Sequence, residues 1–417
     1  MNTVLQFFRT LHQTKEMMIE RFEAFHRYVA QVSPKSPFQL DAEKAEGIYV
    51  YDRSGKQYID LLSGISVCNV GHRHPKVLDA IRAQMDKYLH VMVYGEFVQQ
   101  PQLELAQLLA SVLPAQLQKT FFVNSGSEAI EGAIKLARRV NKRSGIVAFR
   151  KSYHGSTLGV VSVMGAEEFR APFRPLLPDV TLLNFNCEED LSQINQSTSC
   201  VIVEPVQAGA GIILPQNNFL QKLSKRCKEV GALLIFDEIQ TGFGRTGKLF
   251  GFENFDVVPD ILCIAKGMGA GMPIGAFISS EKLMEYLNDT HPLLGHATTF
   301  GGHPLSCVAA KANLEIILSE NLPVKANAKG EYLRKELLQH PAVKDVRGIG
   351  LFMALELNEP EKTKKLIYSC ISNGLITYSY LFNPNAVGIA PPLVITQDEM
   401  EEVIRRMKKA LDEIIMI

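Results

Sequence analysis

The 417-residue chain lacks several features that mark particular classes of protein. Its 44 Lys and Arg residues balance 44 Asp and Glu residues, and it has no dense basic run, so it lacks the positive field that nucleic-acid binding uses. No apolar run approaches the roughly 20 residues that cross a bilayer. Residues 1–15 lack the pattern of a secretory signal. These absences predict a soluble protein with neither a nucleic-acid nor a membrane partner.

The seven cysteines are scattered along the chain, and no two of them form a Cys-x-x-Cys pair. Such a set favours neither a disulfide framework nor a zinc site, so we expect no metal. Reduced thiols are typical of the cytoplasm, which is the location that we expect. No Gly-x-Gly-x-x-Gly loop stands between a predicted strand and a predicted helix, which argues against a dinucleotide-dependent dehydrogenase.

From about residue 119 the chain alternates short apolar runs with longer amphipathic stretches, which is the pattern of an α/β fold. Runs that are apolar throughout predict strands covered on both faces, and therefore a mostly parallel sheet. The predicted strands are Thr120–Val123, Ile146–Phe149, Val180–Leu183, Cys200–Val203, Leu233–Phe236, Ile261–Ala265 and Gly275–Ile278.

The two ends of the chain have a different character. Residues 46–60 predict a hairpin whose turn lies at Asp52–Gly55. Beyond residue 300, helices are expected at 304–319, 323–339 and 397–414, around short strands near 343–357 and 374–378. We therefore predict a large α/β domain over residues 68–300. A smaller α+β domain would combine the N-terminal segment, residues 1–67, with residues 301–417.

Ligands of parallel sheets bind at the carboxyl ends of the strands, so polar residues that directly follow a strand are candidates for a site. Ser125, Gly126 and Ser127 open a helix after the first strand, where free N–H groups, hydroxyls and the helix dipole suit a phosphate. A plain serine N-cap explains this segment alone equally well. Tyr153 and His154 follow the second strand and offer an aromatic ring beside a turn glycine, which is also common packing.

Carboxylates and a lysine follow three further strands. Glu204 follows the fourth strand and Asp237 the fifth, and buried acids at neighbouring strand ends need partners. Glu238 is equally well an acid cap, but Asp237 follows four apolar residues, and we expect it to have a cationic partner. Lys266 follows the sixth strand, where burial would lower its pKa toward that of a nucleophile or base. A lysine before a glycine turn is more often a surface residue.

A phosphate cradle, a stacking ring, an acid for a ring nitrogen and a lysine for an aldehyde are together what pyridoxal phosphate requires. In chain order these segments resemble the motifs of the class III aminotransferases of pyridoxal-phosphate fold type I. The resemblance extends from Gly71–Pro75 to Pro391–Leu393. The motifs between them are Ser125–Ala129, Tyr153–Gly155, Glu204–Gln207, Asp237–Gly247, Ala265–Gly267 and Thr299–Pro304.

This resemblance implies a fold type I transferase that moves an amino group from an amine or amino acid donor to a 2-oxo acid by a ping-pong mechanism. Lys266 would form the Schiff base with the cofactor and move the proton, while Asp237 would keep the pyridine nitrogen protonated. The alternative chemistry on the same fold is that of an aminomutase, a racemase or a decarboxylase. A non-catalytic cofactor-binding module is a further alternative, against which the presence of Lys266 and Asp237 argues.

The remaining roles also follow from the resemblance. Gly126 and Ser127 would bind the phosphate, Tyr153 and Ile239 would pack on the two ring faces, and Gln240 would reach the phenolic oxygen. The counterpart of Thr299 binds phosphate from the second subunit, which implies a homodimer with shared active sites and leaves a tetramer open. The full set of expected cofactor-binding residues is Ser125, Gly126, Ser127, Tyr153, His154, Glu204, Asp237, Ile239, Gln240, Lys266 and Thr299.

Three positions depart from the family pattern. Gly209 and Gly388 stand where relatives carry a switchable glutamate–arginine pair for substrate carboxylates, and Ser156 stands where they carry a further arginine. Loss of both members of the pair is coherent, because one alone would leave a buried charge unpaired. We therefore expect that the enzyme does not bind its substrates as the ornithine, acetylornithine and 4-aminobutyrate transaminases do. The departures favour a donor with an apolar or neutral end beside the cofactor, such as an ω-amino acid, a diamine or an aryl amine. Arg170 and Arg174 could replace the carboxylate clamp, but arginines at such positions are more often simply exposed surface residues.

Overall fold

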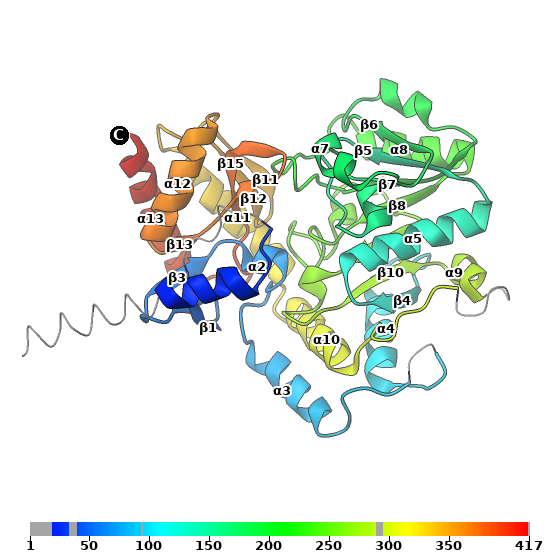
Figure 1. Cartoon of the computed structure of the whole chain (residues 1–417), viewed down its shortest axis with the longest axis horizontal. Coiled ribbons are helices and arrows are strands. Elements are labelled where there is room, and N and C mark those ends of the chain that lie inside the picture. Colours follow the sequence, from blue (N-terminus) through cyan, green and yellow to red (C-terminus); the bar gives the residue numbers. More distant parts are fainter. Residues whose placement is uncertain (1–18, 33–39, 93–94, 289–294, 416–417) are drawn as a thin grey trace, which may run out of the picture.

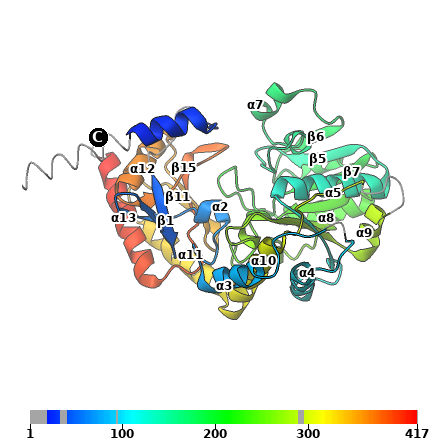
Figure 2. The same ribbon diagram turned by 60° about the horizontal axis from the view of Figure 1, so that its bottom comes forward.

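A computed structural model describes residues 19–32, 40–92, 95–288 and 295–415. The chain forms two lobes, a larger one built on a seven-stranded sheet and a smaller one that contains two four-stranded sheets (Figure 1, Figure 2). Within the described ranges, no helix combines the length and the apolar character needed to span a membrane. The expectation about a secretory signal concerns residues 1–15, which lie outside the described residues.

The larger sheet has the strand order β4-β10-β9-β8-β7-β5-β6. The neighbouring pairs β9-β8, β8-β7, β7-β5 and β5-β6 are parallel. By contrast, β10 runs antiparallel to both β4 and β9. The mostly parallel sheet predicted from the continuous apolar runs is therefore confirmed. The strands are β4 (Lys119–Val123), β5 (Gly145–Phe149), β6 (Val180–Leu183), β7 (Thr198–Val203), β8 (Leu233–Asp237), β9 (Ile261–Ile264) and β10 (Gly275–Ser279).

Helices cover both faces of this sheet, which is why its strands are apolar throughout. Alternate residues of β7 point to opposite faces, so Val201 packs in the cluster that contains α8, and Cys200 packs in the cluster that contains α5. Three alanines of α5, at positions 129, 133 and 137, are fully buried and allow close packing on the sheet. The helices of this lobe are α4 (Gln100–Val112), α5 (Gly126–Asn141), α6 (Leu158–Val161), α7 (Glu167–Arg170), α8 (Phe219–Val230) and α9 (Glu281–Asn288). Short 3-10 turns are η1 (Ala171–Phe173), η2 (Glu189–Gln193), η3 (Gly251–Asn254) and η4 (Lys266–Met268).

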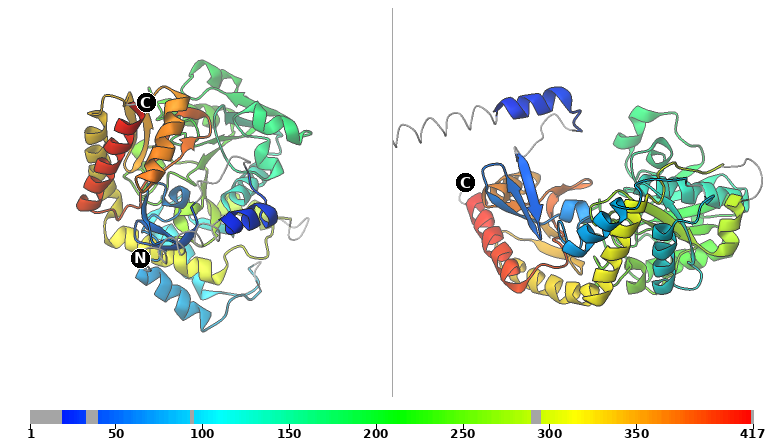
Figure 3. Two further views of the ribbon diagram at one scale, coloured as in Figure 1. Left: turned by 60° about the vertical axis from the view of Figure 1, so that its left-hand side comes forward. Right: turned by 90° about the horizontal axis from the view of Figure 1, so that it is seen from below.

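The smaller lobe combines both ends of the described chain. One sheet has the order β1-β2-β3-β13 and the other the order β11-β12-β15-β14. The strands are β1 (Ala42–Glu46), β2 (Tyr49–Asp52), β3 (Gln57–Asp60), β11 (Asp345–Ile349), β12 (Phe352–Glu356), β13 (Leu375–Ile376), β14 (Ser379–Tyr380) and β15 (Asn383–Ile389). The remaining helices are α2 (Ser63–Ser66), α3 (Pro75–Met85), α10 (Pro304–Ser319), α11 (Leu322–Leu338), α12 (Pro360–Ser372) and α13 (Gln397–Ile415). Figure 3 shows α10 running along the side where the two lobes meet, packed against α3.

The two lobes are joined at the loop that follows β7. Val206, Ala208 and Ile212 of this loop form a buried cluster with residues of β12 and β15. The Arg347 guanidinium donates to the carbonyl oxygen of Gly211 at 2.6 Å and pairs with a buried carboxylate of β12 at 2.9 Å. The smaller lobe is therefore held directly against the carboxyl end of the larger sheet.

Most of the elements predicted from the sequence are present. The hairpin forms between β2 and β3, and the Gly55 amide donates to the carbonyl oxygen of Asp52 at 2.9 Å to close its turn. The three C-terminal helices expected at 304–319, 323–339 and 397–414 are α10, α11 and α13. Several elements were not predicted, among them β1, α3, α4, α12 and β15. The division of the chain at residues 67 and 300 remains a prediction.

Candidate active site

A cavity of about 430 Å³ lies where the sequence analysis expects a ligand, at the carboxyl ends of β7, β8 and β9. Ten of the eleven predicted cofactor-binding residues line it, and they come from five separate segments of the chain. These residues are Ser125, Gly126, Ser127, Tyr153, His154, Glu204, Asp237, Ile239, Gln240 and Lys266. The exception is Thr299, which is exposed and does not line the cavity of the single chain.

One end of the cavity is a cradle of backbone and hydroxyl groups at the start of α5. The Ser125 side chain accepts a hydrogen bond from the Glu128 amide at 3.2 Å and so caps the helix, as the plain interpretation of this segment required. The Ser127 hydroxyl accepts one from the Ser156 amide at 3.2 Å. The capped helix still directs its dipole into the cavity, which suits an anion.

Two glycines keep this cradle open. A Cβ atom on Gly126 would lie 2.6 Å from the Cδ1 atom of Ile239, and one on Gly155 would lie 2.1 Å from the Ser127 hydroxyl oxygen. Gly155 also has a φ of +132°, which residues with a side chain rarely adopt. Glycine at these positions therefore lets the cavity-lining segments pack against Ile239 and Ser127 without displacing those side chains.

Asp237 ends β8 and is buried against His154. Its Oδ2 atom lies 2.7 Å from the Nδ1 atom of His154, and its Oδ1 atom accepts a hydrogen bond from the Ile239 amide at 3.0 Å. Burial alone would lower the pKa of His154, but the hydrogen bond and charge of Asp237 raise it. The cationic partner that we expect for Asp237 is therefore His154.

Glu204 supports the same region from the end of β7. It accepts hydrogen bonds from the amides of Tyr153 at 3.0 Å and Ala208 at 2.9 Å. Glu204 therefore holds the backbone of these two segments in place. Burial raises its pKa to about 7, although the nearby charge of His154 acts in the opposite direction. Glu204 thus connects the Tyr153 segment to the loop that holds the smaller lobe.

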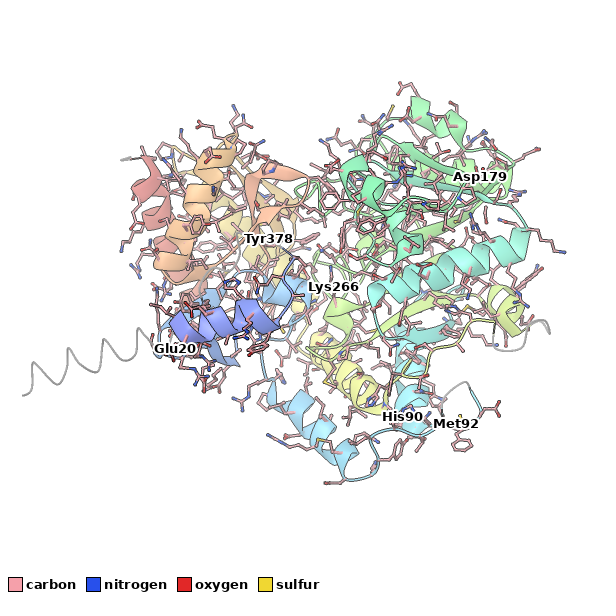
Figure 4. The ribbon with its side chains drawn as sticks, viewed as in Figure 1. Glu20, His90, Met92, Asp179, Lys266 and Tyr378 are labelled. Atoms are coloured by element: carbon pink, nitrogen blue, oxygen red, sulfur yellow. The ribbon has the colours of Figure 1, made fainter. Side chains whose placement is uncertain are left out.

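Lys266 follows β9 and lines the same cavity, and Figure 4 shows it between the two lobes. Its side chain is partly accessible from the cavity but is otherwise surrounded by protein. Burial lowers its pKa to about 8, and the negative charges of Asp237 and Glu204 only partly offset this effect. Its backbone has a φ of +42°, a left-handed conformation that costs energy for a residue other than glycine. This amine can therefore be neutral, and hence nucleophilic, near neutral pH.

The structure also adds residues that the sequence reasoning did not single out. Val67 reaches the cavity from the smaller lobe, and Asn124 and Met272 line its rim. The Asn124 amide group donates to the hydroxyl of Thr298 at 2.7 Å, which ties the segment before Thr299 to this rim. Asn124 directly follows β4, so the search at strand ends could have found it. Val67 and Met272 do not directly follow a predicted strand, so that search passed over them.

The two arginines that were candidates for a carboxylate clamp are both engaged with Glu167. The Arg170 guanidinium lies 3.5 Å from this carboxylate, and the Arg174 guanidinium forms a further ion pair with it. Each arginine therefore already has an acidic partner on the surface of the larger lobe.

An anion cradle, a buried acid that can face a ring nitrogen and a lysine of lowered pKa are the requirements of pyridoxal phosphate, so the fold and the cavity together define a pyridoxal-phosphate-dependent transferase. The family model of the class III aminotransferases matches residues 30–411. The chain therefore belongs to the class III aminotransferases, whose members use pyridoxal phosphate.

Individual relatives agree with this assignment. The chain is 40% identical over 380 residues to the acetylornithine aminotransferase of Methanopyrus kandleri, a match that covers 90% of this chain and 95% of that one. A crystal structure of the ornithine aminotransferase of Toxoplasma gondii, with pyridoxal phosphate at partial occupancy in its active site, has a TM-score of 0.89 at 26% identity and covers 98% of each chain. An (S)-enantioselective omega-transaminase from Thermomicrobium roseum has a TM-score of 0.85 at 30% identity, with 93% of this chain and 96% of that chain covered. The protein is thus an aminotransferase that uses an amino donor and a 2-oxo acid.

Proposed function

We propose that Lys266 and Asp237 are the catalytic residues of this aminotransferase. When bound, pyridoxal phosphate supplies an aldehyde that takes up an amino group and a ring that withdraws electrons from the neighbouring carbon. The Lys266 amine is the attachment point for this aldehyde and afterwards carries the proton that is moved during the reaction. The observation that supports this role best is a lysine of pKa about 8 that shares one cavity with a buried acid.

The other predicted residues hold the cofactor in place. The Asp237 carboxylate keeps a proton on the ring nitrogen. His154 orients this carboxylate through the 2.7 Å contact between its Nδ1 atom and the Oδ2 atom of Asp237. Ser125, Gly126 and Ser127 bind the phosphate. The remaining roles are those of Tyr153 and Ile239 on the ring faces, Gln240 at the phenolic oxygen and Glu204 behind the Tyr153 backbone.

Of the donors that the sequence favours, we select an amine whose far end is uncharged, such as an aryl amine, because the far end of a diamine or an ω-amino acid is charged at neutral pH. This proposal rests on Gly209, Gly388 and Ser156, which place neither a carboxylate nor a guanidinium where relatives recognise substrate carboxylates. It distinguishes the chain from its relative that is named as an acetylornithine aminotransferase.

A panel of donors with oxoglutarate and pyruvate as acceptors tests both the reaction and the donor. We expect that donor alone releases one equivalent of carbonyl product per site and that subsequent oxo acid becomes an amino acid, with ping-pong kinetics. Return of the unchanged amino acid as its enantiomer, or release of carbon dioxide, would contradict transamination. Efficient turnover of ornithine or acetylornithine would contradict the proposed donor alone.

We infer that the active unit is a homodimer in which Thr299 completes the site of the other subunit. Thr299 is exposed next to Phe300, and further exposed apolar side chains are those of Met85, Leu89, Met92, Phe97, Val98 and Leu103. The ring of His90 lies 5.1 Å from that of Phe300, so these two segments form one surface. Such a surface suits a second copy of the chain. The seven free thiols accord with the cytoplasmic location that we propose.

Mixed dimers of one Lys266→Ala chain and one Thr299→Ala chain test this arrangement. If Thr299 acts in the partner's site, one of the two sites has both residues intact, and the mixed dimer regains about half of the wild-type activity. If Thr299 acts within its own chain, both sites lack one residue, and the mixed dimer stays as inactive as its parents.

A further inference from the structure

Aromatic rings occupy the space at two of the three positions that depart from the family pattern. A Cβ atom on Gly209 would lie 3.0 Å and 3.1 Å from two ring carbons of Phe382, and 3.7 Å from the Cβ atom of Tyr153, which lines the cavity. The amide of Phe382 also donates to the carbonyl oxygen of Gly209 at 2.9 Å. Any side chain at position 209 would therefore have to displace the Phe382 ring.

The space beside Gly388 is also occupied by aromatic rings, here those of Tyr378 and Tyr380. A Cβ atom there would lie 3.3 Å from the Cε1 atom of Tyr378 and 3.4 Å from the hydroxyl oxygen of Tyr380. Tyr380 cannot easily move, because it is buried and its hydroxyl donates to the carbonyl oxygen of Met353 at 2.6 Å. Burial raises the pKa of Tyr378 to about 12, so its phenol remains uncharged. The third position, Ser156, has its hydroxyl 3.0 Å from that of Tyr153.

We call the rings of Phe169, Phe382 and Tyr378, the last of which packs at Gly388, the aromatic wall. The rings of Phe169 and Phe382 meet edge to face, with centroids 5.6 Å apart and an interplanar angle of 87°. Phe169 belongs to α7 of the larger lobe, and the other two rings come from the region of β14, so the wall spans the two lobes. Figure 4 shows Tyr378 on the side of the smaller lobe that faces Lys266. All three rings remain partly accessible.

Three arginines of the segments around the wall are already paired with glutamates. Arg170, next to Phe169, and Arg174 share Glu167, while Arg347 binds Glu356 and the carbonyl oxygen of Gly211. A donor carboxylate brought against the wall would lose water without gaining a free charge from any of these three arginines, which is unfavourable. An apolar or aromatic chain would instead bury its surface against ring faces and edges.

We propose that the aromatic wall is the specificity-determining surface of this aminotransferase, which binds the uncharged carbon chain of the donor and discriminates against donors that end in a carboxylate. This inference rests on the proposed function and names the residues responsible for its donor preference. Phe382 is the central residue, because it contacts both Phe169 and the Gly209 segment.

Phe382→Ala in the holoenzyme tests the wall, with Phe173→Ala as the control because Phe173 is a phenylalanine of η1 that is 55% exposed. Donors would be 4-phenylbutylamine, propylamine and 4-aminobutyrate with pyruvate as acceptor. We expect Phe382→Ala to raise KM for 4-phenylbutylamine about tenfold with kcat little changed, because an uncharged contact present in ground and transition state alike is lost. KM for propylamine should change little, and Phe173→Ala should match the wild type for all donors.

A double-mutant cycle separates a direct role from a general loss of structure. Gly209→Ala should displace the Phe382 ring and raise KM for 4-phenylbutylamine, but it should have no further effect in the Phe382→Ala background. Phe382→Leu, which keeps apolar volume, should give an intermediate KM. The absorbance of the bound cofactor and the melting temperature report whether each variant is folded.

The wall has no such role if Phe382→Ala leaves the ratio of kcat/KM for 4-phenylbutylamine and 4-aminobutyrate unchanged, or if the two substitutions of the cycle act additively. Preference of the wild type for 4-aminobutyrate would also overturn it. Failure of the wild type to convert any amine or amino acid would instead count against the proposed function, so the two failures are distinguishable.

Discussion

Replacement of Asp237 by Asn removes one negative charge from the cavity while retaining nearly the same shape. In the wild type this carboxylate lies 2.7 Å from His154 and accepts a hydrogen bond from the Ile239 amide. An Asn side chain can still accept that hydrogen bond through its oxygen. The substitution therefore tests the charge of the group rather than its volume.

The expected magnitude follows from the electrostatics of the buried site. Two opposite unit charges about 4 Å apart interact by about 4 kcal/mol at an effective dielectric constant near 20. Loss of this interaction with a protonated ring nitrogen lowers the rate of the donor half-reaction by about 10³-fold, since each 1.36 kcal/mol corresponds to about tenfold. His154 would also lose its ionic partner, so burial would lower its pKa and leave it neutral.

The assay is the single-turnover rate constant of the donor half-reaction, followed by the absorbance of the bound cofactor at saturating donor. Glu238→Gln is the matched control, because Glu238 is the adjacent buried acid but binds Thr241 and the amides of Gly251 and Phe252 instead of lining the cavity. We expect Glu238→Gln to lower the melting temperature but to leave the rate within a few-fold of the wild type. An Asp237→Asn enzyme that retains cofactor and reacts within tenfold of the wild-type rate would refute the reasoning.

Two further predictions concern the lysine and the phosphate cradle. The rate of pyridoxal phosphate uptake by the apo protein should rise as pH increases through about 8 and then level off, because only the neutral Lys266 amine attacks and burial lowers its pKa to about 8; a midpoint near 10.5 would contradict the lowered pKa. Gly155→Ala should weaken pyridoxal phosphate binding about 10- to 100-fold, since the strain and the clash with Ser127 amount to about 1–3 kcal/mol. Gly55→Ala, which has a positive φ but no atom within 4 Å of the added Cβ, is the control and should bind the cofactor like the wild type.

The strands of the larger sheet could be predicted because both of their faces are covered. All six residues of β7 are buried, and the last four, Cys200–Val203, form a continuous apolar run that is recognisable at once. By contrast, β15 begins with Asn383 and Pro384 and contains Gly388, which are residues that strands usually avoid. It forms a strand through its pairing with β12 and β14, and such long-range pairing has no local signal in the sequence.

The site shows the same division between local and long-range information. Asp237 and Lys266 were found because each directly follows an apolar strand. The contact between His154 and Asp237 joins residues 83 positions apart and depends on strand order, which the sequence does not reveal. The aromatic wall was missed for the same reason, although Tyr378, Tyr380 and Phe382 alternate along the chain in a way that indicated one aromatic face.

The central claim is that Lys266 is the residue to which pyridoxal phosphate becomes attached. Reduction of the holoenzyme with borohydride, followed by proteolysis and mass mapping, locates the attachment directly. We predict one pyridoxyl group per chain, on the peptide that contains Lys266, and none in a folded Lys266→Ala variant. A pyridoxyl group on a different lysine of the wild-type enzyme would contradict the account.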